Sequence, residues 1–194
     1  GLDAVGRTES IIGAWMARHP GMRRRVVLAT KAVGRMGPAR WDEGASRKHL
    51  LDAIDASLKR LGTDHVDLYQ LHHDDRTTPL DESLEALATI VRSGRARYIG
   101  LSNFHAWRVT KALGRSDLHG WPRVVCLQPR YNLLFRQIER ELLPMAEEEG
   151  LGVIPYNPLA GGLLTGKHAG GAPTAGTRFE ALGNASAMYR ERYW

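Results

Sequence analysis

The sequence predicts a parallel α/β fold, and two observations support this prediction. Five short segments rich in apolar and β-branched residues alternate with segments whose apolar residues recur at helical spacing. Each helical segment is long enough to return the chain from the end of one strand to the start of a parallel neighbour. A doubly wound sheet and a (β/α)8 barrel both fit this alternation, so periodicity leaves the choice between them open.

The five expected strands are short, and polar or turn-forming residues bound them. The first reads RVVLATK, the second VDLYQLH and the third ARYIGL. Such mostly apolar, β-branched runs are typical of strands in a sheet that is covered by helices. The expected strands cover residues 25–31, 66–72, 96–101, 124–128 and 152–155.

The expected helices carry start and stop signals. Ser46 stands where an N-cap residue is expected, and Gly62 follows the last apolar residues of the same helix. Gly94 and Gly150 follow two later helices in the same way, as residues with a left-handed backbone commonly do. Besides the helix between Ser46 and Gly62, the expected helices cover residues 9–19, 81–91, 104–113 and 138–149.

Length and composition indicate one ordinary globular domain over residues 1–194. The hydrophobic fraction is 43% and the charged fraction 25%, which is typical of such domains. Cys126 is the only cysteine, so no internal disulfide forms and a reducing cytoplasm is expected. No apolar run has the length of a membrane span, and we expect no signal peptide. We therefore expect no membrane partner.

The net charge of +6 raises the question of nucleic-acid binding. Basic residues are scattered, with Arg23–Arg25 as the tight cluster and Glu147–Glu149 as an acidic counterpart. Aromatic residues are not interleaved with Arg and Lys as a stacking platform requires. A solvated surface is therefore favoured over a nucleic-acid partner.

A polar side chain lies at the carboxyl end of each expected strand or just after it, where parallel α/β proteins collect functional groups. Each one also has an ordinary structural interpretation. Lys31 fits a lysine that leaves for solvent, His72 a core histidine, and Asn103 the N-cap of a helix that begins at Phe104. Five polar exits in succession nevertheless indicate one shared site. These exits are Lys31, His72, Ser102 with Asn103, Gln128 and Tyr156.

Five longer motifs resemble the aldo-keto reductases, in the order and spacing of that family and over nearly the whole chain. They read VLATK at 27–31, SLKRLGTDHVDLYQLH at 57–72, GRARYIGLSNF at 94–104, LQPRYNLL at 127–134 and VIPYNPLAGGLLTGK at 153–167. The sequence is most similar to the bacterial branch related to voltage-gated potassium-channel β subunits. The resemblance implies a (β/α)8 barrel that binds NADPH without a Rossmann domain, in agreement with the absence of a G-x-G-x-x-G turn.

The resemblance also implies roles for the residues at the strand exits. Lys31 and His72 match catalytic positions, and Tyr156 matches an aromatic residue that stacks on the nicotinamide ring. Ser102, Asn103 and Gln128 match the positions that hold the nicotinamide carboxamide. The loop that wraps the pyrophosphate and ribose corresponds to Asn157, Pro158, Leu159, Gly161, Leu163 and Lys167. A small-molecule carbonyl substrate is implied, and no metal.

The match departs from the family at both ends of the sequence. The family's catalytic Asp and Tyr precede a helix start that Thr8-Glu9 resembles, but residues 1–7 contain no tyrosine. Asp3 is the candidate for the aspartate. The first barrel strands, the eighth strand and the region that grips the adenosine phosphate have no counterpart, and five strands do not close an eight-stranded barrel. We expect these residues to be the ordered part of a longer protein, with a true fragment as the alternative.

Three functions remain open at this stage. The leading hypothesis is an NADPH-dependent reductase of aldehydes or ketones. The absence of a tyrosine before Thr8 favours a second hypothesis, an NADP-binding regulatory or scaffold subunit with little turnover. A lyase that forms a Schiff base through Lys31 is the third. The substrate, the preference between NADPH and NADH, and the oligomeric state are not determined by the sequence.

Overall fold

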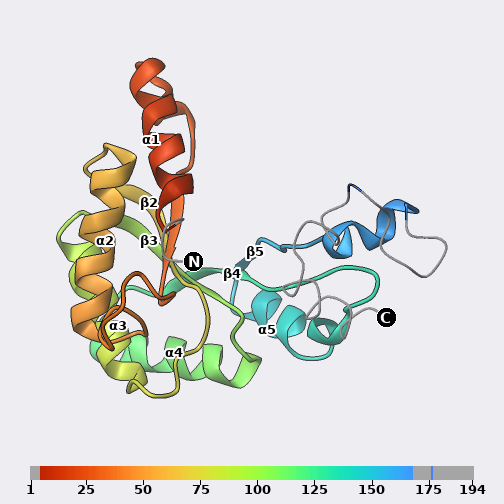
Figure 1. The fold of residues 1–194 in the computed structure, drawn as a ribbon. Helices are drawn as coiled ribbons and strands as arrows, with labels where there is room; N and C mark the ends of the chain where they lie inside the picture. The colour runs from red at the N-terminus through yellow and green to blue at the C-terminus, as the bar shows by residue number, and fades with distance from the viewer. Residues whose placement is uncertain (1–4, 168–175, 177–194) are drawn as a thin grey trace.

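The computed structural model describes residues 5–167 and Gly176. Helices and strands alternate along the described chain, as expected (Figure 1). The strands are β1 (Ala29–Ala32), β2 (Val66–Leu71), β3 (Ala96–Ser102), β4 (Val124–Gln128) and β5 (Gly152–Val153). The α-helices are α1 (Arg7–Arg18), α2 (Arg47–Leu61), α3 (Leu80–Arg92), α4 (Ala106–His119) and α5 (Leu142–Glu148). Short 3₁₀ helices cover η2 (Met22–Arg25), η3 (Gln137–Glu139) and η4 (Ala160–Thr165).

The order of the strands decides between the two α/β architectures. All five strands are parallel, and they lie in the order β1-β2-β3-β4-β5. A doubly wound sheet reverses its order at a switch point, whereas a barrel adds each strand beside the previous one. The sheet is therefore a run of five successive βα units of a (β/α)8 barrel, and β1 and β5 are the two edges of its described part.

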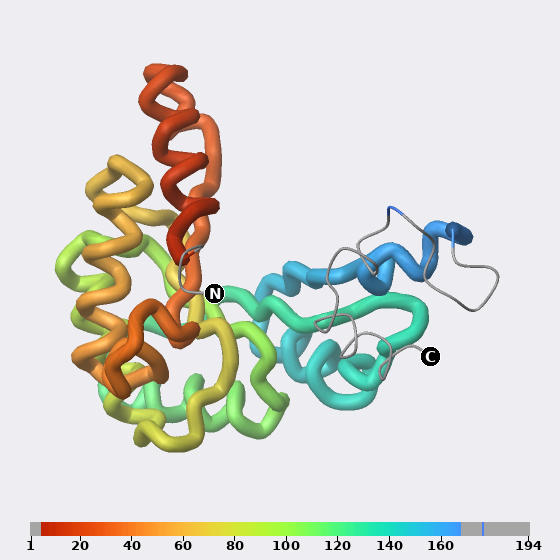
Figure 2. Tube along the Cα trace, in the orientation of Figure 1, coloured from red at the N-terminus to blue at the C-terminus, as the bar shows by residue number. Residues whose placement is uncertain are grey.

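Helices form an arc outside the sheet, from α1 through α2, α3 and α4 to α5 (Figure 1; Figure 2). Each helix contacts the next one in this arc. The first contact depends on Gly13, because a Cβ at this position would lie 2.3 Å from the carbonyl oxygen of Arg60. No helix in the described part of the chain has the length and apolar character that crossing a membrane requires.

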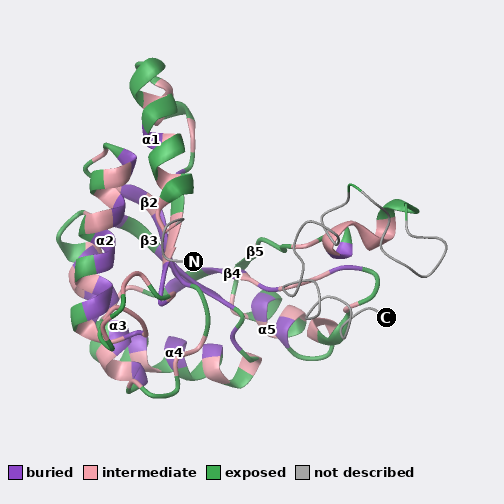
Figure 3. Ribbon diagram, viewed as in Figure 1, coloured by how far each residue is buried: buried purple, intermediate pink, exposed green. Residues whose placement is uncertain are grey.

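The core lies between the sheet and the helices, where the inward faces of α2 and α3 are buried (Figure 3). Tyr69 in β2 is fully buried, and its hydroxyl donates to the carbonyl of Leu50 in α2 at 3.1 Å. The neighbouring side chains in β2 alternate, so that Gln70 points away from these helices. Its register partners are Lys31 in β1 and Gly100 in β3, which places the three residues on one row across the sheet.

Two helices differ from the expectation. Helix α4 begins at Ala106 and continues through Gly114 to His119, because Gly114 is tolerated inside a helix and Gly120 takes the left-handed conformation that ends it. The helix expected at 138–149 is two elements, η3 and α5. Pro144 lacks an N–H, so α5 begins at Leu142 and places the proline in its first turn.

The first and last strands are shorter than expected. Pairing with β2 begins at Leu28, since residues 22–25 form the 3₁₀ helix η2. Strand β5 ends at Val153, but the backbone N–H of Ile154 still donates to Leu127 and that of Tyr156 to Pro129. The extended backbone therefore leads directly from β5 to Tyr156.

Replacing Ser46 with alanine is expected to lower the free energy of unfolding by about 1 kcal/mol. Ser46 is the N-cap of α2, and its hydroxyl accepts from the backbone N–H of His49 at 3.3 Å, as predicted. Urea unfolding of the intact protein measures the change. The Ser46→Asp variant is the control, because it keeps an acceptor at the cap. An equal loss in both variants would contradict the capping role.

Candidate active site at the strand exits

A continuous chain of hydrogen bonds joins the exits of four consecutive strands. The hydroxyl of Tyr156 donates to Asn103 Oδ1 at 2.8 Å. Asn103 Nδ2 donates to the carbonyl oxygen of His72 at 2.9 Å and to Ser102 Oγ at 3.0 Å. The Ser102 hydroxyl in turn donates to the carbonyl oxygen of Gln128 at 2.7 Å. Residues at or just after the carboxyl ends of β2, β3, β4 and β5 thus meet in one polar network.

Asn103 occupies a special backbone position in this network. Its φ of 58° lies in the left-handed region, which asparagine tolerates better than most residues. The N-cap of α4 is His105, so the interpretation of Asn103 as a cap for a helix beginning at Phe104 is wrong. The turn instead leaves the Asn103 side chain at the rim of the sheet, between His72 and Tyr156.

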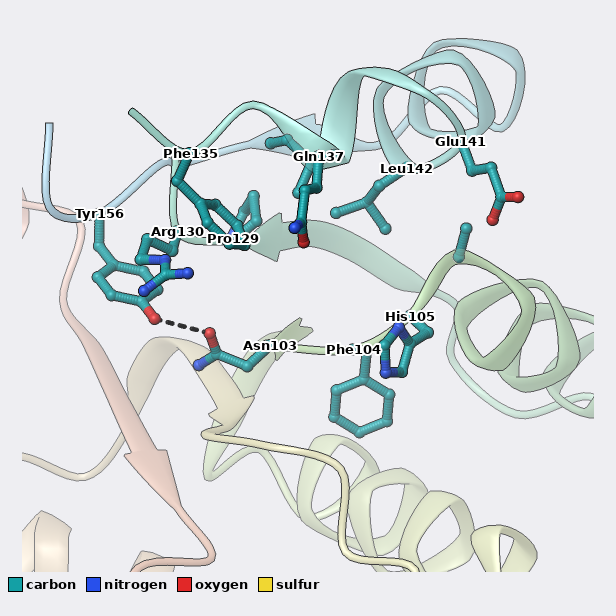
Figure 4. A pocket seen from close by; sticks show the side chains of 12 residues that line it. Asn103, Phe104, His105, Pro129, Arg130, Phe135, Gln137, Glu141, Leu142 and Tyr156 are labelled. Atoms are coloured by element: carbon teal, nitrogen blue, oxygen red, sulfur yellow. Dashed lines mark hydrogen bonds between the residues drawn. The ribbon is translucent and has the colours of Figure 1, made fainter. Parts of the chain in front are cut away.

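Tyr156 lines a pocket of about 330 Å³ (Figure 4). The loop after β4 fixes its backbone, because the Tyr156 N–H donates to Pro129 at 3.0 Å and its carbonyl accepts from Tyr131 at 3.3 Å. Arg130 and Phe135 line the same pocket, with the guanidinium 3.5 Å from the centre of the Phe135 ring. Tyr156 is 37% exposed, so it lies at the surface of the strand exits.

A second cavity, of about 620 Å³, lies against the other strand exits. Lys31, His72 and Gln128 line it together with Gln70. Burial lowers the pKa of the Lys31 ammonium. Partial burial also lowers the pKa of His72, and the charges of Lys31 and His73 lower it further. These effects favour the neutral imidazole of His72 over its charged form.

The carboxylate of Glu9 also lines this cavity, at the start of α1. Its two oxygens accept from Thr30 Oγ1 at 2.5 Å and from Arg60 Nε at 2.6 Å. The negative charge of Glu9 is therefore balanced by Arg60. Within the described residues, no hydrogen bond or ion pair joins the ammonium group of Lys31 to a carboxylate.

The loop after Tyr156 is held by hydrogen bonds within the loop and by the loop after β4. Asn157 has a φ of 62°, and its Oδ1 accepts from the N–H of Gly161 at 2.5 Å. Buried Asn132 donates from Nδ2 to the carbonyl of Asn157 at 3.0 Å. The other predicted loop residues follow in or around η4, where Leu159 and Lys167 are exposed; the remaining ones are Pro158, Gly161 and Leu163.

The structure therefore brings together most of the predicted residues in two adjoining groups, whereas Asp3 lies outside the described residues. Sequence reasoning missed Gln70 and Asn132. Gln70 stands two residues before His72 in a strand, so alternation alone places both on one face. The signal for Asn132 is weaker, because a buried asparagine in a loop becomes evident only from its partners.

The loop that follows His72 is fastened by Asp75. Its carboxylate accepts from the backbone N–H groups of Ala45 at 2.8 Å and Thr77 at 2.9 Å, and from the hydroxyls of Thr77 and Thr78. Burial on its own raises the pKa of Asp75, but these hydrogen bonds outweigh it and hold the pKa well below its usual range. The loop that leads from His72 is thereby tied to the loop before α2.

Replacing Asp75 with asparagine is expected to lower the free energy of unfolding by about 1 kcal/mol near neutral pH. A carboxylate whose pKa is depressed in the folded state stabilises above its unfolded pKa of about 3.9, and loses this effect as the pH falls toward the folded value. The difference between the two proteins should therefore shrink below that pH. Chemical unfolding between pH 3 and pH 7 tests this, with Glu148→Gln on the exposed end of α5 as the control. A difference that does not depend on pH would contradict the assignment.

A singly wound parallel sheet with polar groups at its carboxyl end has the architecture of a (β/α)8 barrel with its site at the rim. The family model for the aldo/keto reductase family matches residues 5–189. The chain belongs to the aldo/keto reductase family.

Three relatives illustrate the range of this similarity. An uncharacterized oxidoreductase of Bacillus subtilis, YrpG, is 47% identical over 90% of this chain and 54% of its own length. A probable voltage-gated potassium channel subunit beta of Arabidopsis thaliana is 37% identical over 91% of this chain and 54% of its own. The L-glyceraldehyde 3-phosphate reductase of Escherichia coli O157:H7 is 41% identical over 78% of this chain and 44% of its own. The chain thus spans about half the length of the relatives that it matches.

Proposed function

We propose that this protein is an oxidoreductase that transfers hydride from NADPH to the carbonyl carbon of an aldehyde or ketone, while the carbonyl oxygen takes up a proton from solvent, so that an alcohol and NADP⁺ form. The observation that carries the proposal is the hydrogen-bonded network at the strand exits, which joins His72, Ser102, Asn103, Gln128 and Tyr156. Membership of the aldo/keto reductase family supports it, as do relatives whose names describe an oxidoreductase and a reductase.

The chemistry of the groups at the strand exits fits a nicotinamide. A carboxamide needs both donors and acceptors: Asn103 Oδ1 offers an acceptor, the side-chain amide of Gln128 offers both, and buried Ser102 supports Asn103 by accepting from its amide. The ring of Tyr156 offers a flat apolar face. The turn at Asn157 and the glycines of η4 let the backbone approach a phosphate group closely. Bound NADPH would supply the hydride, and these residues would hold its ring so that one face is presented to the substrate. In this proposal Pro158, Leu159, Leu163 and Lys167 complete the binding loop.

Lys31 and His72 would act on the substrate oxygen. Negative charge develops on a carbonyl oxygen as it accepts hydride, and a nearby positive charge and a hydrogen-bond donor stabilise that charge. The Lys31 ammonium provides the charge in a partly buried setting, where electrostatic interactions are stronger than in water. Neutral His72 can donate a hydrogen bond to the oxygen and orient it.

The proposal is tested by titrating the intact protein with NADPH and with NADH while its tryptophan fluorescence is recorded. Binding of NADPH, followed by oxidation of the cofactor at 340 nm when an aromatic aldehyde is added, is the expected result. Tighter binding of NADPH than of NADH would establish the expected preference. Failure to bind either cofactor would refute the proposal.

A second candidate is an NADP-binding regulatory or scaffold subunit with little turnover. The printed name of one relative favours it, since the Arabidopsis protein is called a probable voltage-gated potassium channel subunit beta. The same titration separates the two functions, because this subunit would bind NADPH without oxidising it.

A compartment with reduced thiols, such as the cytoplasm, agrees with the buried, unpaired Cys126.

A further inference from the structure

The hydroxyl of Tyr156 has a hydrogen-bonding role that stacking by its ring does not require. It donates to Asn103 Oδ1 at 2.8 Å, across 53 positions of the sequence (Figure 4). A phenylalanine would offer the same flat face to a ligand ring. The hydrogen bond therefore serves Asn103, and its consequence is found in the asparagine side chain.

The partners of Asn103 determine which way its amide is turned. The carbonyl oxygen of His72 accepts hydrogen bonds but donates none, so the NH2 group of Asn103 must face it. The Ser102 hydroxyl already donates its hydrogen to the carbonyl of Gln128. Its oxygen therefore accepts the second hydrogen bond from the NH2 group of Asn103. Both amide hydrogens are then occupied. Oδ1 consequently faces Tyr156, which holds it there as a donor.

An amide oxygen has two lone pairs, and the Tyr156 hydroxyl uses one of them. The Asn103 side chain is exposed at the rim, so the second lone pair is open to a ligand. A ligand group that meets Asn103 must therefore bring a donor, such as the NH2 of a carboxamide. The carbonyl oxygen of the same carboxamide has to find its donor elsewhere.

We infer that Tyr156 is a positioning residue whose hydroxyl, together with the His72 carbonyl and the Ser102 hydroxyl, holds Asn103 in the orientation that recognises the NH2 of the nicotinamide carboxamide. This inference depends on the proposed function, because it assumes that a nicotinamide binds at the strand exits. It assigns to Tyr156 a selectivity for the carboxamide that is separate from stacking. The left-handed backbone of Asn103 keeps the side chain within reach of the hydroxyl.

The test compares two cofactors that differ in one group. NADPH carries the carboxamide, and its acetylpyridine analogue carries an acetyl group that keeps the oxygen but has no NH2. Fluorescence titration gives the ratio of the two dissociation constants for the wild type and for Tyr156→Phe. Loss of one orienting hydrogen bond is expected to weaken NADPH binding by about fivefold and to leave the analogue within about twofold. The preference for NADPH, measured as the ratio of the two dissociation constants, should therefore fall by about fivefold.

Two further variants make the result specific. Tyr131→Phe removes another hydroxyl in the neighbouring loop, where it donates to Glu139 at 2.6 Å, and is expected to leave the preference unchanged. Asn103→Gly removes the amide but suits the left-handed backbone, so it should abolish the preference without strain. Adding Tyr156→Phe to Asn103→Gly should then cause no further change, because the hydroxyl acts through the asparagine.

Each outcome decides the inference. A preference that survives in Tyr156→Phe overturns the positioning role and leaves the proposed function intact. Equal weakening of both cofactors also overturns it, because the hydroxyl would then support only the loop. If the wild type binds neither cofactor, the proposed function and this inference both fall.

Discussion

Replacing Lys31 with methionine is expected to lower kcat for carbonyl reduction by about 10²- to 10⁴-fold. Methionine keeps the unbranched shape of the side chain but removes its charge, so the oxygen that receives hydride loses its cationic neighbour. Cofactor affinity should change little, because the groups proposed to hold the nicotinamide belong to the network of Asn103 and Tyr156. Stopped-flow hydride transfer together with fluorescence titration separates these two effects.

The environment of Lys31 also predicts a pH dependence. Burial lowers the pKa of its ammonium, so the charged form is lost at a lower pH than in an exposed lysine. Activity should therefore decline on the alkaline side below pH 10.5, the ordinary value for lysine. This decline should be absent from the residual activity of Lys31→Met.

Lys59, exposed on the outer helix α2, provides the matched control. Lys59→Met should retain wild-type kcat. Borohydride added with an aldehyde substrate distinguishes a competing mechanism, since a covalent adduct trapped at Lys31 would identify a Schiff-base lyase. Such an adduct, or full activity in Lys31→Met, would exclude the role proposed for this lysine.

The largest loss of stability is expected when Tyr69 is replaced with alanine. Tyr69 is fully buried between the sheet and α2, so removal of its ring leaves a cavity that the surrounding structure fills only in part. The free energy of unfolding should fall by about 3–5 kcal/mol. Tyr69→Phe loses the hydrogen bond to Leu50 and should cost about 1 kcal/mol. Urea unfolding of both variants divides the loss between ring and hydroxyl.

Tyr98 offers a comparison within the same sheet. It lies in β3 and is 59% exposed, so Tyr98→Ala should change the unfolding free energy by less than about 1 kcal/mol. Similar losses at Tyr69 and Tyr98 would show that burial against α2 is not the source of the stability of this region.

Local signals in the sequence were enough to predict five strands and the helices between them. Alternating and helical periodicities reflect which faces are buried, and a cap such as Ser46 acts through its nearest neighbours. The predicted bounds of two helices were wrong, in each case near a residue that helices disfavour. Gly114 weakens a helix without ending it, and Pro144 has to lie in a first turn, so α4 is longer and α5 shorter than periodicity predicted.

The residues of the candidate site likewise fall into those that the sequence predicted and those that it did not. The polar residue after each strand is visible in the sequence because strands end where apolar runs end, and the family resemblance gives these residues proposed roles. Gln70 could have been found from the alternation of β2, which places it on the same face as His72, whereas the importance of Asn132 comes from its partner 25 positions away in the chain.

Residue types and their spacing thus establish the alternation of helices and strands and the presence of a polar group at each strand exit. Three-dimensional folding decides the rest: the sequential strand order that makes the sheet part of a barrel, and the hydrogen bonds from Tyr156 through Asn103 to His72. The reason is physical. A helix cap or a strand's alternation is satisfied within a few residues, whereas a strand's neighbour and an amide's orientation depend on groups that only the complete fold brings together.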